Sequence, residues 1–99
     1  MGIYLEPDAT FSVSIQDNGG ARFAVVEGPE IKLRTATGRE YAAIMKAIRE
    51  EDACAGYDLL GKLVKDGVKD VSRLHPNVAA LLIYEVAKRS HLTETEAGN

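Results

Sequence analysis

Thr35-Ala36-Thr37-Gly38 is the stretch at which the hydrophobic pattern of this chain changes its period. Before it, apolar and polar residues alternate, as in Phe11-Ser12-Val13-Ser14-Ile15 and Ile31-Lys32-Leu33, a pattern typical of strands with one buried face. After it, apolar residues recur every three or four positions, which indicates an amphipathic helix. We expect that helix to bury Tyr41, Ile44, Met45 and Ile48.

The chain of 99 residues is predicted to form a single domain over 1–99, because a chain this short has room for one hydrophobic core. We expect an extended lead-in over 1–10, an antiparallel β-meander of about three strands over 11–34, and about three helices over 38–91. The last residues, 92–99, form a polar tail that we expect to be disordered. The predicted fold class is α+β, with the N-terminal meander packed on the C-terminal helices.

Local signals mark the ends of several elements. Asp17-Asn18-Gly19-Gly20 predicts a hairpin turn after the first strand, since Asn and Gly tolerate the positive φ that tight turns need. Thr37 and Glu40 fit a capping box, in which each side chain bonds the backbone amide of the other residue. We expect the helix that starts there to end between Glu51 and Gly56.

Two further helices are predicted from apolar spacing and from their terminal residues. We expect one from Tyr57 to Lys65 and the last from Pro76 to about Ser90, since proline suits the first helical position. The stretch from Val78 to Tyr84 is apolar on nearly every face. This pattern predicts that the last helix is the central helix of the core.

The sequence carries no motif that is typical of an active site. Cys54, the single cysteine, lies between two alanines, and we expect a small buried thiol rather than a nucleophile. His75 and His91 stand at opposite ends of the last helix and cannot share one metal ion within a monomer. We therefore expect no catalytic residue, no cofactor and no metal, and we predict that the protein is not an enzyme.

The charge balance argues against nucleic-acid and membrane partners. Twelve Lys and Arg residues are interspersed with fifteen Asp and Glu residues, for a net charge of −3, whereas a nucleic-acid site needs clustered basic residues. The first residues lack the basic start and apolar run of a secretory signal, and the longest apolar stretch is far shorter than a membrane span. We expect neither kind of partner and a cytoplasmic location.

Surfaces that bind other proteins are the remaining candidate sites. An open strand edge of the meander is a natural place for adding a strand from another chain. The last helix is more apolar than a core of this size requires, so part of it is a candidate subunit interface, with simple burial as the alternative. The candidate partner-binding residues are Phe23, Val25, Ile31, Leu33, Leu81 and Tyr84.

The order of segments supports a comparison with known proteins. A short β part passes through the stretch from Ile31 to Glu40 into a helix, a leucine-bearing helix follows, and Val71-Ser72-Arg73-Leu74-His75-Pro76 opens the last helix. Over residues 11–90 this layout resembles small tail-assembly proteins of tailed bacteriophages, the tail-assembly-chaperone type in particular.

The resemblance implies a non-enzymatic protein that binds other phage tail or virion proteins and forms a homo-oligomer within an assembly. It implies a location in the host cytoplasm during assembly, or in the virion if the protein is a mature structural component of the tail or baseplate. The alternative from another class is a cytoplasmic regulatory or antitoxin-like binding module.

Overall fold

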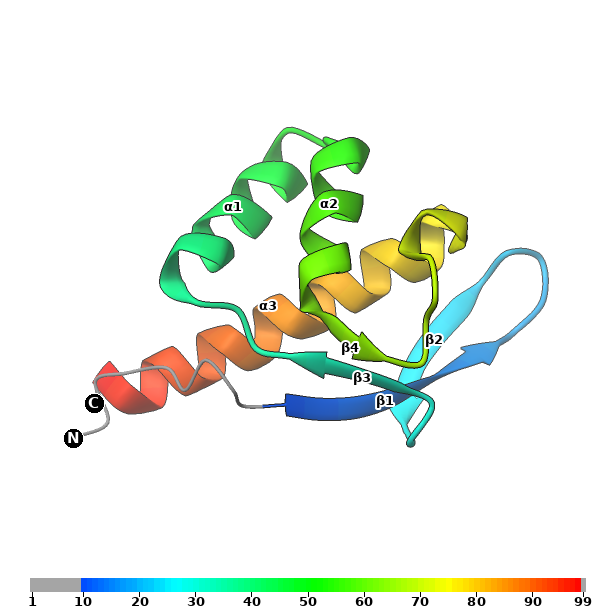
Figure 1. The fold of residues 1–99 in the computed structure, drawn as a ribbon, viewed down its shortest axis with the longest axis horizontal. Coiled ribbons are helices and arrows are strands. Elements are labelled where there is room, and N and C mark those ends of the chain that lie inside the picture. Colours follow the sequence, from blue (N-terminus) through cyan, green and yellow to red (C-terminus); the bar gives the residue numbers. More distant parts are fainter. Residues whose placement is uncertain (1–9, 99) are drawn as a thin grey trace.

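A computed structural model describes residues 10–98 of this chain, with side chains described for residues 10–90. Within these residues, a four-stranded antiparallel sheet carries helices on one face, which confirms the predicted α+β class (Figure 1). Its strands are β1 (Thr10–Asp17), β2 (Phe23–Glu27), β3 (Ile31–Arg34) and β4 (Val64–Asp66), in the order β2-β1-β3-β4. Its helices are α1 (Gly38–Arg49), α2 (Ala53–Leu63), the short 3-10 helix η1 (Val71–Arg73) and α3 (Pro76–Gly98).

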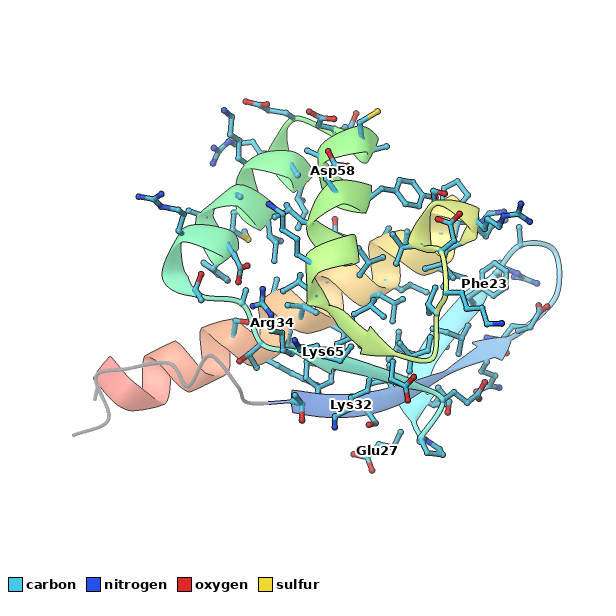
Figure 2. The ribbon with its side chains drawn as sticks, viewed as in Figure 1. Phe23, Glu27, Lys32, Arg34, Asp58 and Lys65 are labelled. Carbon is cyan, nitrogen blue, oxygen red and sulfur yellow. The ribbon has the colours of Figure 1, made fainter. Side chains whose placement is uncertain are left out.

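The sheet has one apolar face against the helices and one polar face. In β1, Val13 is buried and lies opposite Ile31 of β3, which is buried as well. Ser12 lies opposite Lys32, and both are exposed. Lys32 lies on the side of the sheet that points away from the helices (Figure 2). This arrangement confirms the alternation in the sequence, because successive side chains of a strand point to opposite faces.

The predicted hairpin between β1 and β2 is present. The amide of Asn18 donates to the carbonyl of Arg22 at 2.8 Å, and that of Arg22 to the carbonyl of Gly19 at 3.1 Å. The loop needs three consecutive residues at positive φ, 83° at Gly19, 61° at Gly20 and 61° at Ala21. Glycine adopts this backbone without strain, which explains the glycine pair in the turn.

The strand β4 is an element that the sequence analysis missed. Val64 and Lys65 were expected to continue the second helix, but they belong to a strand that pairs with β3, with Leu33 opposite Val64. A strand of three residues is too short to show an alternating pattern. Its extended backbone is stabilised by hydrogen bonds to a strand that lies some 30 residues earlier in the chain.

The first two helices begin and end at capping residues. The capping box predicted for α1 is confirmed, with the Glu40 amide donating to Thr37 Oγ1 and the Thr37 amide donating to Glu40 Oε1. The predicted end of α1 was too late, since the helix ends at Arg49. The predicted start of α2 at Tyr57 was also too late, because Asp52 accepts a hydrogen bond from the Ala55 amide and caps a helix that starts at Ala53.

The long helix α3 begins at Pro76 as predicted, but it continues to Gly98 instead of ending near Ser90. Residues 92–98, where a disordered tail is expected from the sequence, continue this helix, and no glycine or proline precedes Gly98 among them to break it. The predicted lead-in over 1–9 and Asn99 lie outside the described residues.

The core lies between the sheet and the three long helices. Its fully buried members include Val13, Leu33, Ile44, Leu60, Leu63, Leu82 and Val86. The helix α3 contacts α1, α2 and β2, which confirms its predicted central position. Met45 was expected in the core but is 39% exposed, because the buried face of α1 is a narrow one centred on Ile44 and Ala47.

The buried hydroxyl of Ser90 connects α3 to the link between β3 and α1 by hydrogen bonds. Ser90 is completely buried, accepts a hydrogen bond from the Ala36 amide at 2.8 Å, and donates one to the Val86 carbonyl at 2.8 Å. The link between β3 and α1 therefore has its buried amide satisfied by a side chain 54 residues away.

Candidate functional site

An apolar groove of about 250 Å³ lies where the end of α1, the start of α2 and the first half of α3 meet. We call this site the three-helix groove. The groove is lined by Ala47, Ile48, Glu51, Asp52, Ala53, Gly56, Tyr57, Pro76, Ala79, Ala80, Ile83 and Tyr84. Most of these side chains are small or apolar, so the groove offers apolar surface with few groups that form hydrogen bonds.

The first wall of the three-helix groove is held by a tight turn between α1 and α2. The Glu51 amide donates to the Ile48 carbonyl at 3.1 Å, and the Asp52 amide donates to the Ala47 carbonyl at 2.9 Å. Glu51 has a φ of 53°, which lets the chain reverse at once after α1. Because the turn is closed by these hydrogen bonds, the two helix ends form one fixed wall.

The second wall is anchored to the rest of the fold by polar contacts near the start of α3. The hydroxyl of Tyr57 donates to the Leu74 carbonyl at 2.8 Å, which joins α2 to the residues that precede α3. The side-chain amide of Asn77 donates to the Ala21 carbonyl at 2.8 Å, and the rings of His75 and Phe23 lie 5.3 Å apart. These contacts hold the first turn of α3 against the β1–β2 hairpin and make the groove a preformed site.

Small residues form the floor of the groove. Ala47 and Ala79 are 7% and 6% exposed, and Ile83 beside them is 5% exposed. Ala53 and Gly56 on α2 add no bulk, so no side chain of the described chain fills the space between the helices. A protein interior is normally packed without such gaps, and apolar surface left open gains dispersion contacts when another group covers it.

The charge of the groove has one sign. Its ionisable carboxylates, those of Glu51 and Asp52, lie on the turn between α1 and α2, and both residues are exposed. The Asp52 carboxylate also accepts a hydrogen bond from the Ala55 amide at 3.1 Å. Among the described residues, no lysine, arginine or histidine lines the groove, so the two carboxylates are the charged groups of its lining.

Tyr84 borders the groove and is 54% exposed, more than the other exposed large hydrophobic residues of the described chain, Val26 and Met45. It follows Ala80 by one helical turn, so both side chains lie on the same side of α3. Tyrosine combines a large apolar ring with a polar hydroxyl, and it is one of the residues enriched at the centres of protein interfaces.

The six predicted partner-binding residues do not form one surface. Ile31 and Leu33 are 7% and 0% exposed, which corrects their assignment, because β3 lies inside the sheet and turns both side chains to the core. Phe23, Val25 and Leu81 are half-buried, and Phe23 and Val25 pack against the core from the edge strand β2. Tyr84 alone of the six lines the three-helix groove.

Cys54 is exposed, so the expectation of a buried thiol is wrong. The reason is the early start of α2, which places Cys54 in the first helical turn, on the side away from Leu60 and Leu63. Of its two neighbours, Ala53 is exposed and Ala55 is half-buried. Flanking alanines therefore do not indicate that the cysteine between them is buried.

The groove could not be predicted from the sequence, because its residues come from three separate segments. Ala47, Ala53, Gly56, Ala79 and Ala80 each look like ordinary small residues in a helix. The available signal was the concentration of alanine and glycine at the start of α2 and in the first half of α3. Small residues at facing positions of two helices leave space that no neighbour fills.

A second cluster of charged side chains joins the sheet to α1. The guanidinium of Arg34 donates to both oxygens of Glu40 at 2.6 Å, and Glu40 also accepts from the Thr37 amide at 3.0 Å. The hydrogen bonds from Arg34 lower the pKa of Glu40 from 4.5 to about 2, against the opposing effect of burial. Thr37 and Glu40 form the capping box of α1, and Arg34 is the last residue of β3, so we assign the cluster a structural role.

Replacing Glu40 is expected to change how stability depends on pH. Because the pKa of Glu40 is lower in the folded state, its contribution is present above pH 4.5 and is lost as the pH falls towards 2. Glu40→Gln should lower the free energy of unfolding by about 1.5–3 kcal/mol at pH 7 and by much less at pH 2. Urea unfolding across this range measures the effect, with the exposed Glu30→Gln as the control. Parallel pH profiles for the wild type and Glu40→Gln would contradict this role.

No protein-family model, curated protein or solved structure matches this chain. In the part of the chain that the structure describes, no group of three or more His, Cys, Asp or Glu side chains is placed to hold a metal ion. None of the helices described is both long enough and apolar enough to cross a membrane.

Proposed function

We propose that this chain is a non-enzymatic interaction protein of a bacteriophage tail, which acts in tail or virion assembly by docking another tail protein in the three-helix groove. The observation that carries the proposal is the groove itself, a preformed apolar space of about 250 Å³ bordered by an exposed tyrosine. The layout of the sequence, which resembles small tail-assembly proteins, supports the class of partner.

The physical argument is that burial of apolar surface drives association, at roughly 25 cal/mol per Å². A partner side chain that enters the groove covers Ala79, Ala80 and the ring of Tyr84 without displacing any described side chain. The walls are held by hydrogen bonds within the protein, so little conformational entropy is lost when the partner binds.

The proposal predicts that partner capture depends on Tyr84. Tagged protein purified from its native host should recover tail tube, tape-measure or baseplate proteins, identified and quantified by mass spectrometry. Tyr84→Ala should reduce that recovery at least about tenfold, since an exposed aromatic at an interface centre is worth more than 1.4 kcal/mol. The fold should be unaffected, because the Tyr84 side chain is largely outside the core.

Met45→Ala is the matched control, because Met45 is also an exposed, large apolar residue on a helix but does not line the groove. Equal recovery with wild type, Tyr84→Ala and Met45→Ala would overturn the groove as the docking site. Recovery of a single cytoplasmic enzyme or a toxin in place of tail proteins would overturn the phage assignment and favour the regulatory module.

A further inference from the structure

We infer that the three-helix groove takes one large apolar side chain carried on a basic segment of the partner protein, with Lys or Arg next to the apolar residue. The inference rests on the proposed function and specifies the chemistry of the partner. It is argued from the size of the groove, from the nature of its floor and from the charge at its end.

The size of the groove selects a single anchoring side chain. Its volume of about 250 Å³ is larger than the ~150 Å³ cavity that holds a benzene molecule, and smaller than the ~300–1,000 Å³ of most small-molecule sites. A space of this size holds one phenylalanine or leucine side chain of the partner, together with part of the residue next to it in the partner's sequence.

The floor of the groove requires that this side chain be apolar. Ala47, Ala79 and Ile83 present methyl groups, and each is less than one tenth exposed. A polar group placed against them would lose its water without gaining a hydrogen bond. Tyr57 also lines the groove, but its hydroxyl already donates to the Leu74 carbonyl.

The charge at the end of the groove selects a basic neighbour for the anchor. Glu51 and Asp52 line the groove, and among the described residues no cationic side chain lines it with them. An acidic segment would therefore meet repulsion at this end, whereas a basic one meets attraction. A Lys or Arg beside the anchor also covers apolar surface with its methylene stem while its charged group reaches the carboxylates.

Three synthetic peptides of about ten residues test the inference, because extended and helical segments of this length bind such grooves. The first has a central phenylalanine among lysines, the second has the same phenylalanine among glutamates, and the third has alanine in place of phenylalanine among lysines. Their affinities for the full chain are measured by fluorescence anisotropy of a terminal dye. We expect the first peptide to bind at least about tenfold more tightly than either of the others.

Two variants of the protein test whether the preference for a basic peptide arises at the groove. Glu51→Lys should weaken binding of the phenylalanine–lysine peptide by about five- to tenfold. Glu50→Lys makes the same change of charge at the adjacent position, outside the groove, and should weaken binding by less than about twofold. Circular dichroism checks that both variants fold. Raising the salt concentration to about 0.5 M should reduce the advantage of the lysine peptide over the glutamate peptide.

The outcomes separate this inference from the proposed function. Equal binding of the lysine and glutamate peptides, with Tyr84→Ala weakening both, would overturn the basic partner and leave the groove as a docking site. Equal weakening by Glu50→Lys and Glu51→Lys would also overturn it, because net charge rather than the groove would then decide binding. Failure of all three peptides to bind the wild-type protein would overturn the inference and the groove together.

Discussion

Leu82→Asp is expected to abolish the folded state of this protein. Leu82 is completely buried in the first half of α3, which contacts both other long helices and the sheet. The substitution removes a large apolar side chain and leaves a carboxylate with no described partner in its place, a change that costs several kcal/mol. Since a domain of this size is stable by only about 5–10 kcal/mol, the unfolded state should predominate.

Thermal unfolding followed by circular dichroism measures the effect. The wild-type protein should show one cooperative transition, and Leu82→Asp should show none. Leu82→Met conserves the volume and polarity of the side chain and should lower stability by less than about 1.5 kcal/mol. If Leu82→Asp melts at the temperature of the wild type, the core has been placed on the wrong side of α3.

Gly67→Ala is expected to have the second-largest effect on stability. Gly67 directly follows β4 and has a φ of 95°, and a β-carbon added there would lie 2.0 Å from the carbonyl oxygen of Glu30 and 2.9 Å from the α-carbon of Ile31. Both obstructing atoms belong to the backbone, so they cannot move aside as a side chain can. The positive φ and the clash together should cost about 3 kcal/mol or more, measured by urea unfolding.

Gly61→Ala is the matched control and should act in the opposite direction. Gly61 lies within α2 and is exposed, and a β-carbon there would meet Val71 Cγ2 at an ordinary distance of 3.6 Å. Alanine favours a helix over glycine by about 1 kcal/mol, so this variant should be slightly more stable than the wild type. A small loss or a gain of stability in Gly67→Ala would show that the pairing of β4 with β3 is not formed as described.

Sequence patterns among residues a few positions apart predicted several features correctly. The capping box at Thr37 and Glu40, the hairpin turn through Gly19 and Gly20, and the start of α3 at Pro76 are all present. Each depends on a backbone conformation or a hydrogen bond between residues at most four positions apart. The change of hydrophobic period likewise predicted the α+β class, because it reflects which face of each element is buried.

Features that depend on distant segments were missed or misplaced. Val64 adopts a strand conformation because β3 offers it an unpaired edge, and Leu33, its partner, is 31 positions away. Leu33 itself was taken for a partner-binding residue because the pattern predicts a buried face without saying what covers it. The exposure of Cys54 follows from the Asp52 cap, a short-range signal that the sequence analysis overlooked.

The fold class, the capping of α1 and the central position of α3 could be predicted from the sequence, because these follow from local hydrogen bonding and from the spacing of apolar residues. The fourth strand and the three-helix groove could not, because they depend on how distant segments pack together. The groove exists because small residues on α1, α2 and α3 face one another across a space that none of them fills. Such a space depends on how the helices pack, which is set by the balance of all core contacts rather than by any one segment.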